Sequence, residues 1–475
     1  MTMDNNGKPL AASRRRFLGA GGMAAGAALG GLSPLGRLLA AAGGAGTTGT
    51  GRSRGYGPLR PVRDENTGLP LLHLPEGFRY RSFGWVGDPM VDGELMPAAH
   101  DGMGIVRAEG GRVRLIRNHE VSRIGPAFGK PAFQYDPNAQ GGTVTLDYDC
   151  DSGKLMSAHA SLAGTMTNCS GGITPWGSWL SCEEFVSAAG KTVMTKSGLG
   201  RLERDHGFVF EVPADGHSDA VPIRDMGQFR HEAAVVFPSS GDVYLTEDLE
   251  PVAGFYRFVP KTPGRLSDGG ALYMLRARGR EELRSGLTLG QPMDVDWVRV
   301  ENPDHGIDSE HDDIRGVQRQ ALKQGASKFT RLEGIFVSGA DLFFTATNGG
   351  NAGCGQVFRY RPAEQQLTLI YESSDPAVLD YPDNICVSPR GGMVICQDSK
   401  GDSQSLFGLT AGHELFEFAR NNVILDGATK GLSGDFRRSE WAGSCFTPDG
   451  QWLFANVYSP GFTVAITGPW GEGLV

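Results

Sequence analysis

The chain has 475 residues, 40% of them hydrophobic, and a formal net charge of −9. This length and composition allow a large core, and the acidic balance excludes binding to nucleic acid or anionic membranes through a basic surface. The 70 glycines and 27 prolines, with no long amphipathic helix pattern after the N-terminus, favour a turn-rich all-β protein.

The first 42 residues have the pattern of a targeting segment. Residues 13–18 read Ser-Arg-Arg-Arg-Phe-Leu, the twin-arginine pattern, and an Ala/Gly-rich stretch follows with a small-residue cleavage site at Ala40 and Ala42. We expect a signal peptide over residues 1–42, the twin-arginine translocase as a partner during export, and a periplasmic or secreted protein. A single-span membrane anchor is the alternative, which the weak hydrophobicity disfavours. Removing these residues takes away five basic residues and one acidic residue, so the net charge shifts from −9 to −13.

Residues 43–65 are rich in Gly, Ser, Thr and Arg, and predict a flexible linker. The folded part is then expected over residues 66–475 as one domain. Its first predicted strand covers residues 78–83, where apolar and polar side chains alternate.

One short unit recurs along the folded part. An apolar run is followed by a turn with Gly or Pro, a second apolar run, and an acidic or amide residue, which predicts a β-hairpin. The six units are Asp101–Glu120, Gly171–Glu184, Glu232–Asp248, Glu333–Asn348, Asp383–Asp398 and Gly443–Asn456.

Alternating strands lie between these hairpins, at residues 207–213, 254–260, 355–362 and 413–419. An inner hairpin followed by outer strands is the repeat of a propeller blade, so we predict a six-bladed β-propeller with a metal site at one end of its axis. The least regular segment is 261–330, which contains an acid/His cluster at 304–313. That cluster has metal-binding residue types, but a solvated loop is the favoured interpretation.

Carboxylates stand at both ends of most hairpins. The two ends of a hairpin are neighbours in space, so six hairpins around one axis would gather these groups on one face, where cations are needed to offset their repulsion. Acids that merely occupy loops are the alternative. The opening acids are Asp101, Glu232, Glu333 and Asp383; the closing residues are Glu120, Glu183 or Glu184, Glu247 or Asp248, Asn348, Asp398 and Asn456.

Other residue types near these ends also point to chemistry. Cys169 lies in a turn-like stretch before a hairpin, and a thiolate would favour a transition ion over Ca²⁺, although a buried structural thiol is equally compatible. Arg230 and Arg331 each stand two residues before an acid, where a guanidinium could bind an anionic oxygen or form a plain salt bridge. His119 and His231 are interpreted as packed loop histidines. Arg390, in a hairpin turn, belongs to the opposite end.

Several reaction classes find no support. The sequence has no GxSxG, Walker loop or HExxH, which argues against nucleophile-elbow hydrolases, P-loop NTPases and zincins. Three of the seven cysteines, Cys386, Cys396 and Cys445, lie within apolar strands and are predicted to be buried.

The chain resembles the PhoX-type alkaline phosphatases. The similarity rests on seven segments that span most of residues 100–470: HDGMGIV (100–106), RNHE (117–120), TNCSGGITPWGSWLSCEE (167–184), GQFRHE (227–232), TRLEG (330–334), PDNICVSPRGG (382–392) and CFTPDGQWLFANVYSPG (445–461). Where the family usually has Arg-Pro-Glu, this chain has Arg331-Leu332-Glu333.

The resemblance implies a six-bladed propeller whose axial site holds Fe³⁺ and Ca²⁺ and hydrolyses phosphate monoesters. It implies that Arg331 contacts the phosphate, and it suggests Arg438 as a further basic residue of the site. Carried over by motif, Cys169, Glu232 and Glu333 are the expected iron ligands, and the candidates for the remaining iron and calcium positions are Glu120, Glu183, Glu184, Glu247, Asp248 and Asp398.

Together these observations predict an exported, monomeric phosphatase that acts on small-molecule phosphate esters, without stable membrane association. A calcium-dependent propeller esterase or lactonase, and a non-catalytic binding propeller, are the alternatives. The metal content and the substrate distinguish the three hypotheses.

Overall fold

The computed structural model describes residues 54–195, 198–472 and 474–475, all within the compact unit Leu32–Val475. The predicted signal peptide and residues 43–53 of the predicted linker lie outside these residues. The linker prediction is wrong for Arg60–Val62, which form β1 and pair with β2 (Leu72–Leu74). Within the described ranges, no helix has the length and apolar character needed to cross a bilayer.

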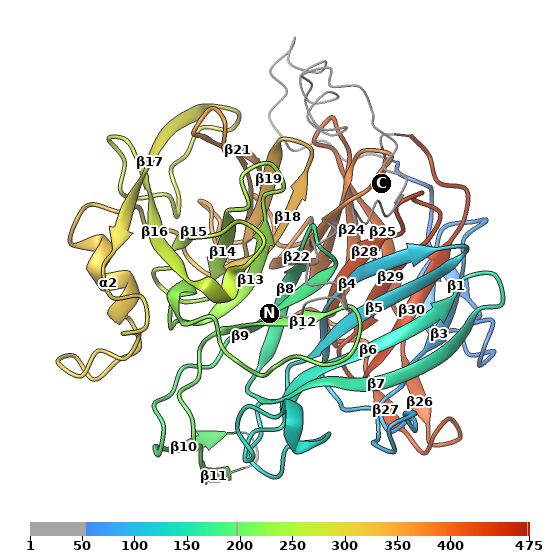
Figure 1. Cartoon of the computed structure of the whole chain (residues 1–475). Coiled ribbons are helices and arrows are strands. Elements are labelled where there is room, and N and C mark those ends of the chain that lie inside the picture. The colour runs from blue at the N-terminus through green and yellow to red at the C-terminus, as the bar shows by residue number, and fades with distance from the viewer. Residues whose placement is uncertain (1–53, 196–197, 473) are drawn as a thin grey trace, which may run out of the picture. The chain divides into compact units, whose positions relative to one another are not determined.

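The protein is all-β, and each of the six predicted hairpins forms (Figure 1). In every hairpin the two apolar runs are antiparallel strands joined by the expected Gly- or Pro-containing turn. The inner pairs are β4 (His100–Glu109) with β5 (Arg112–His119), β8 (Asn168–Ile173) with β9 (Ser178–Glu183), β13 (His231–Val236) with β14 (Val243–Glu247), β18 (Leu332–Ser338) with β19 (Asp341–Ala346), β22 (Pro382–Val387) with β23 (Met393–Gln397), and β28 (Trp441–Phe446) with β29 (Leu453–Val457).

Outer strands extend each hairpin on one side. The strand expected near residues 78–83 is β3 (Arg79–Phe83), which pairs with β30 (Phe462–Thr467) and so completes the last sheet with the first part of the fold. The others are β6 (Gly141–Asp149), β7 (Lys154–Thr165), β12 (Val209–Pro213), β15 (Phe255–Pro260), β16 (Gly270–Ala277), β17 (Pro292–Val300), β20 (Gln356–Arg361), β21 (Gln366–Glu372), β24 (Ser405–Leu409) and β25 (Leu415–Asn421).

The first strands of the hairpins form a closed ring. Strand β4 contacts β8, β8 contacts β13, β13 contacts β18, β18 contacts β22, β22 contacts β28, and β28 returns to β4. Neighbouring strands in the ring come from different sheets, which is the arrangement around the axis of a propeller. The fold is therefore propeller-like.

The prediction of six separate blades needs correction. Among the described residues, the sheets of three or more strands number five, with six, three, nine, four and four strands. The nine-stranded sheet arises because β17 reaches across and pairs with β21, at Pro292–Asp294 against Gln366–Thr368. This contact joins a group of five strands, β13 to β17, to a group of four, β18 to β21, which the sequence pattern treats as separate.

Small elements complete the fold around the loops. They are two further hairpins, β10 (Thr192–Thr195) with β11 (Gly198–Arg201) and β26 (Ile424–Asp426) with β27 (Ser433–Asp435), the helix α2 (Gly316–Leu322), and the 3₁₀ turns η1 (Pro131–Phe133), η2 (Arg224–Met226) and η3 (Leu266–Asp268).

Apolar clusters lie between neighbouring groups of strands around the ring. In one of them Phe255 of β15 stacks on Phe344 of β19 at 4.3 Å, and Phe344 stacks on Phe358 of β20 at 5.2 Å. Each of these rings is fully buried, and burial of a side chain of this size contributes about 1.5–3 kcal/mol. Aromatic packing thus holds the two parts of the nine-stranded sheet against each other and helps to fix their inner strands in the ring.

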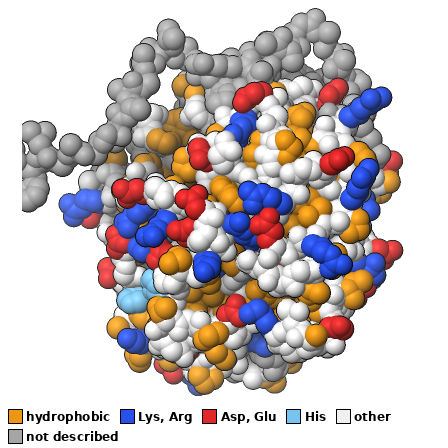
Figure 2. All heavy atoms as spheres, turned by 90° about the vertical axis from the view of Figure 1, so that its right-hand side faces the viewer, with side chains coloured by type: hydrophobic (Ala, Val, Ile, Leu, Met, Phe, Trp, Pro, Cys, Tyr) orange, Lys and Arg blue, Asp and Glu red, His pale blue; other side chains and the backbone are white. Residues whose placement is uncertain are grey.

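Figure 2 shows one face of the molecule, on which acidic, basic and hydrophobic side chains are interspersed. No large field of one sign covers the visible described surface there. A concentration of carboxylates lies instead at one end of the ring of inner strands.

Candidate metal centre

A β-bulge lies near the start of every first strand in the ring. In β4, two residues, Asp101 and Gly102, stand opposite one residue of β5, because the register shifts between His100 and Met103. The same shift follows the first ladder pairs of β8, β13, β18 and β22, and it occurs one residue later in β28. A bulge re-aims the side chain of its extra residue. The first bulge residues of the five equivalent hairpins are Asp101, Cys169, Glu232, Glu333 and Asp383.

The second bulge residue is small in most hairpins because neighbouring inner strands approach closely there. A Cβ on Gly102 would lie 2.4 Å from Cα of Ser170, and a Cβ on Gly334 would lie 2.7 Å from Cα of Asn384. Real Cβ atoms do not tolerate such distances, so glycine is required at both places. The narrow axis in turn brings the first bulge residues of different hairpins together.

The end of each second strand is tied back to the start of its hairpin by a recurring backbone hydrogen bond. The first residue after the second strand donates its N–H to the carbonyl of the residue two positions before the bulge; for Glu184 and Thr167 the distance is 2.9 Å. The other pairs are Glu120 with Ala99, Asp248 with Arg230, Thr347 with Arg331, Asp398 with Tyr381, and, in the hairpin whose bulge lies one residue later, Tyr458 with Glu440. Strand alternation and this closure direct the donating residue inward, and all but Thr347 line the same cavity.

The cavity has a volume of about 570 Å³. It is lined by ten carboxylates and three arginines, a formal excess of seven negative charges against −9 for the whole chain. The lining residues are Asp101, Glu120, Cys169, Glu184, Arg230, Glu232, Asp248, Arg331, Glu333, Asp383, Asp398, Asp435, Phe436, Arg438, Ser439, Glu440, Tyr458 and Ser459.

Four groups of three donors in this cavity have ligand atoms within 4.8 Å of one another. One contains a sulfur: Cys169, Glu184 and Glu232. Three contain carboxylates alone, and neighbouring groups share Glu232, Asp383 or Glu440, so that the four form a continuous chain. The carboxylate groups are Glu232–Glu333–Asp383, Asp383–Asp398–Glu440 and Asp101–Glu120–Glu440.

The electrostatics of the cavity favour bound cations. Burial, together with the negative charge of neighbouring carboxylates, raises the pKa of Asp101, Glu232 and Glu333 well above the usual range. The pKa of Glu184, Asp383 and Glu440 is raised by the same two causes, and burial and nearby carboxylates raise the pKa of the Cys169 thiol. Such groups ionise readily only when a positive charge is close.

The donor set fits metal ions. Glu232 is 1% exposed, and its Oε2 is buried without a hydrogen-bond partner among the described residues, which is costly for a carboxylate unless something else binds it. Carboxylate oxygens in this number are suited to Ca²⁺, whereas a site with a thiolate is suited to a transition ion.

Two arginines stand among the acids and share one carboxylate. Arg331 donates from Nε to Asp248 Oδ1 at 2.8 Å and from Nη2 to Asp248 Oδ2 at 3.1 Å, and its Nη2 lies 3.0 Å from Glu333 Oε1. Arg230 lies 3.7 Å from Asp248 Oδ2 and forms an ion pair with Glu184. Their side chains are 25% and 35% exposed, so both are cationic groups at the cavity surface.

Asp248 is therefore engaged by guanidinium groups and belongs to none of the four donor groups. The sequence proposed it as a metal ligand. In the structure its contacts are those of a residue that orients two arginines.

Eight residues predicted for the site line the cavity. They are Glu120, Cys169, Glu184, Glu232, Asp248, Arg331, Glu333 and Asp398.

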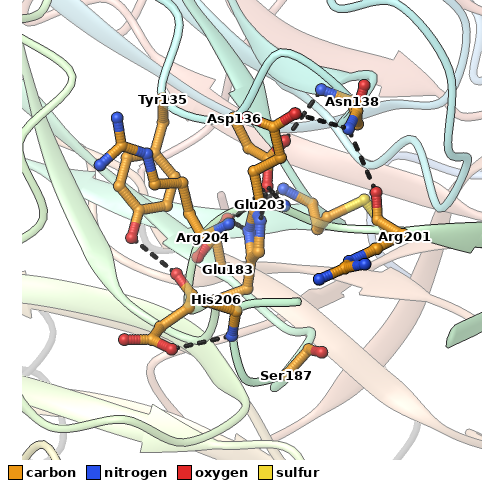
Figure 3. A network of polar contacts seen from close by, with 12 residues as sticks. Tyr135, Asp136, Asn138, Glu183, Ser187, Arg201, Glu203, Arg204 and His206 are labelled. Carbon is orange, nitrogen blue, oxygen red and sulfur yellow. Dashed lines mark hydrogen bonds and ion pairs between the residues drawn. The ribbon is translucent and has the colours of Figure 1, made fainter. Parts of the chain in front are cut away.

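Glu183 and Glu247 do not line the cavity, contrary to the prediction. Glu183 is fully buried behind the cavity and accepts hydrogen bonds from three backbone N–H groups and from His206 (Figure 3). Glu247 accepts from the N–H of Gly254, the hydroxyl of Tyr256 and the amide of Gln318. The sequence could not separate each from its neighbour, because adjacent strand residues differ only in the face they occupy.

The sequence analysis placed Asp101 and Asp383 among the acids expected to gather around cations but did not name them as ligands, and it missed Glu440 altogether. A signal for Glu440 was available. Glu440 occupies the same position in its hairpin as Arg230 and Arg331 do in theirs, immediately before the residue that forms the first ladder pair. The predicted unit begins at Gly443, three residues later, and so leaves Glu440 out.

The remaining candidates lie outside the cavity. His119 and His231 are fully buried, and burial lowers the pKa of both, to about 3 for His231. In the segment 304–313, Asp308 contacts His311 and forms an ion pair with Arg319. Asn348 and Asn456 bond to neighbouring protein groups. Cys386, Cys396 and Cys445 are buried as predicted.

Three solved structures are among those similar to this chain. A protein assigned as a gluconolactonase is 13% identical, over 88% of this chain and 100% of that one, with a TM-score of 0.38. The β-propeller domain of Cps50 (Swd1) from Myceliophteria thermophila is 11% identical over 79% and 88%, with a TM-score of 0.35. The calcium-binding protein regucalcin from Agrobacterium tumefaciens is 11% identical over 83% and 97%, with a TM-score of 0.32. At these TM-scores the likenesses carry no argument about this chain.

Curated proteins offer no sequence match. The family profile described as alkaline phosphatase PhoX matches residues 54–153 and 150–461, most of the chain and every residue that lines the cavity. The chain therefore belongs to the PhoX alkaline phosphatase family.

Proposed function

We propose that this protein is an exported phosphatase that hydrolyses phosphate monoesters with the help of bound metal ions. The family membership supports a hydrolase of this kind. We also interpret the fold as a six-bladed propeller, counting the nine-stranded sheet as two blades that the β17–β21 contact joins. The ring of six inner strands and its repeated bulges support this count.

One observation carries the functional proposal: a single cavity places four groups of metal-donor side chains beside two partly exposed arginines. Carboxylates alone would repel a phosphate ester. Bound cations together with guanidinium groups reverse that sign and provide the positive surface that a phosphoryl group needs.

The donor chemistry suggests how the ions are distributed. Cys169, Glu184 and Glu232 would hold a ferric ion, with Glu333 and Asp383 at an adjacent position. The oxygen-only groups around Asp398, Glu440, Asp101 and Glu120 would hold calcium. When bound, such cations withdraw charge from phosphoryl oxygens and favour nucleophilic attack at phosphorus.

Arg331 would bind and orient the substrate. Its guanidinium plane is fixed by the two hydrogen bonds to Asp248 and by Glu333, so it need not be ordered when the substrate arrives. Burial disfavours the charged form of this group, but the attraction of Glu333 and Asp248 outweighs that effect and raises its pKa, so it stays positive at every working pH. Arg230, held by Glu184 and near Asp248, would present a second cation to the same phosphoryl oxygens.

The N-terminal pattern supports export through the twin-arginine translocase in a folded state, and hence a periplasmic or secreted location. That route would allow metal loading before export.

The test is to purify the exported protein and to measure its metal content, its release of p-nitrophenol from p-nitrophenyl phosphate, and its hydrolysis of a simple lactone. We expect iron with calcium, and turnover of the phosphate ester alone. Lactone hydrolysis with no phosphatase activity would favour the esterase alternative, and a protein purified without tightly bound metal would favour a binding role.

A further inference from the structure

Behind the thiolate-bearing end of the cavity lies a buried network of three ionisable side chains. His206 bridges two carboxylates, with Nδ1 2.6 Å from Glu183 Oε1 and Nε2 3.3 Å from Asp136 Oδ2 (Figure 3). All three residues are fully buried. Burying such groups costs free energy unless every one is paired and hydrogen-bonded, and a buried ion pair by itself adds little net stability.

Backbone N–H groups satisfy the rest of both carboxylates. Glu183 accepts from Met166 at 2.9 Å, Gly207 at 2.9 Å and Phe208 at 3.2 Å. Asp136 accepts from the N–H groups of Asn138, Glu203 and Arg204 at 2.9, 2.6 and 2.9 Å. The network thus ties together four separate stretches of chain, and its carboxylates have no room for a metal ion.

Two of these stretches lead directly to cavity donors. Glu183 immediately precedes Glu184, whose own N–H donates to the carbonyl of Thr167 at 2.9 Å. Met166, which Glu183 binds, precedes Thr167, and Thr167 has a left-handed backbone with φ of 51°. This conformation is unfavourable for a β-branched residue and persists only where the surroundings hold it. Cys169 follows two residues later.

The same bracing recurs elsewhere in the ring. His119 Nδ1 lies 2.9 Å from the carbonyl of Ala98, and Gln397 Nε2 donates to the carbonyl of Asp380 at 3.1 Å. Like Glu183, each is the last residue of a second strand, and each binds the backbone just before a left-handed residue, Ala99 or Tyr381. In three hairpins, then, the strand-ending side chain holds the strained turn that precedes a cavity donor.

We propose that Asp136, His206 and Glu183 form a clamp that positions Cys169 and Glu184 for metal binding, so that Glu183 and His206 are positioning residues. The inference rests on the metal-binding part of the proposed function and assigns a role to residues outside the cavity. Groups that orient metal ligands from behind typically change metal affinity by about 10–100-fold when they are removed.

The readout is the metal-dependent protection of one thiol. Cys169 is partly exposed at the cavity, whereas the other six cysteines are buried, so a bound metal should shield Cys169 from iodoacetamide until a chelator removes it. Mass spectrometry of the purified, exported protein measures alkylation of each cysteine across a series of EDTA concentrations. For Glu183→Gln, in which an amide replaces a carboxylate that accepts from four donors, we expect half-maximal labelling of Cys169 at about 10–100-fold less EDTA than in the wild type.

Two controls separate positioning from loss of stability. Asp242 is buried and bonded to Arg257 at the turn end of the β13–β14 hairpin, so Asp242→Asn should lower the Tm but leave the EDTA dependence of Cys169 unchanged. Buried Cys386 reports global opening within each sample.

The proposal is overturned if Glu183→Gln labels Cys169 at the wild-type EDTA concentration, or only in step with Cys386. It is also overturned if wild-type Cys169 is labelled equally with and without EDTA. If Glu183→Gln does not fold, His206→Gln faces the same criteria. A protein that lacks phosphatase activity but shows the expected labelling would refute the proposed reaction and leave the clamp standing.

Discussion

The two ends of the inner hairpins are built from the same strands but present opposite chemistry. At the open ends of the hairpins, where the first and last residues of each hairpin meet, a cavity of about 570 Å³ is lined mainly by charged residues. At the turns, a second cavity of about 440 Å³ is lined largely by apolar residues such as Ile105, Val235, Ile335 and Phe446. The difference follows from the bulges, which direct polar side chains to the axis at the open ends of the hairpins. Nearer the turns the strands alternate regularly, so apolar side chains face the axis. A common scaffold can therefore confine charge to one end.

The largest expected effect comes from removing a cation at the charged end. Arg331→Ala should lower kcat/KM for p-nitrophenyl phosphate by about 10²–10³-fold, since a group that stabilises transition-state charge is lost. Arg390→Ala, in the turn between β22 and β23, is the matched control at the apolar end and should stay within about twofold. Equal losses in both variants would erase the functional distinction between the two ends.

Shortening an apolar side chain at the turn end should instead lower the free energy of unfolding and leave the metal content unchanged. Ile335 is 4% exposed and lines the apolar cavity, so Ile335→Ala should reduce the free energy of unfolding by about 3 kcal/mol through lost burial and an enlarged void. Denaturant unfolding measures this change, and elemental analysis should find the metal content unaltered. Loss of metal from this variant would mean that the two ends are coupled.

The charge of His206 should make stability depend on pH. Burial lowers the pKa of His206, but the attraction of Glu183 and the hydrogen bonds to both carboxylates outweigh that effect and raise the pKa to about 9. A folded pKa above the unfolded value of about 6.5 gives stabilisation that is fully present below pH 6.5 and is lost as the pH rises through 9. The stability gap between wild type and His206→Gln should shrink by on the order of 2–3 kcal/mol from pH 6 to pH 10.

Denaturant unfolding of both proteins at each pH provides the measurement. Ile335→Ala serves as the comparison, because its deficit should not vary with pH. A pH-independent gap for His206→Gln would show that folding does not raise the pKa of His206.

The smallest expected effect tests whether Asp248 orients arginines or binds metal. Asp248→Asn keeps the shape but weakens the charge-assisted bonds to Arg331, so kcat/KM should fall by about 10-fold, equivalent to about 1.4 kcal/mol. Metal content should remain that of the wild type. A drop in bound metal would instead return Asp248 to the set of ligands that the sequence predicted.

Much of the candidate site could be predicted from short-range pattern. The acids that close the hairpins at Glu120 and Asp398 follow an apolar strand directly, and hairpin geometry alone brings them beside the opening residues. The Cys169 prediction depended on a motif of the family and not on spacing. Glu440 was missed because its hairpin opens one residue out of step with the others.

By itself, the sequence determined the hairpins, the acids at their open ends and the all-β class, because alternation, turn residues and strand-ending acids are signals that span only a few residues. Tertiary structure alone decided which of two adjacent acids faces the axis: Glu184 lines the cavity, while Glu183 turns back to His206, a residue far along the chain. It also decided that β17 pairs with β21 and that β3 completes the sheet of β30. These outcomes depend on which distant surfaces meet and on where buried charge finds partners, and no local pattern encodes either one.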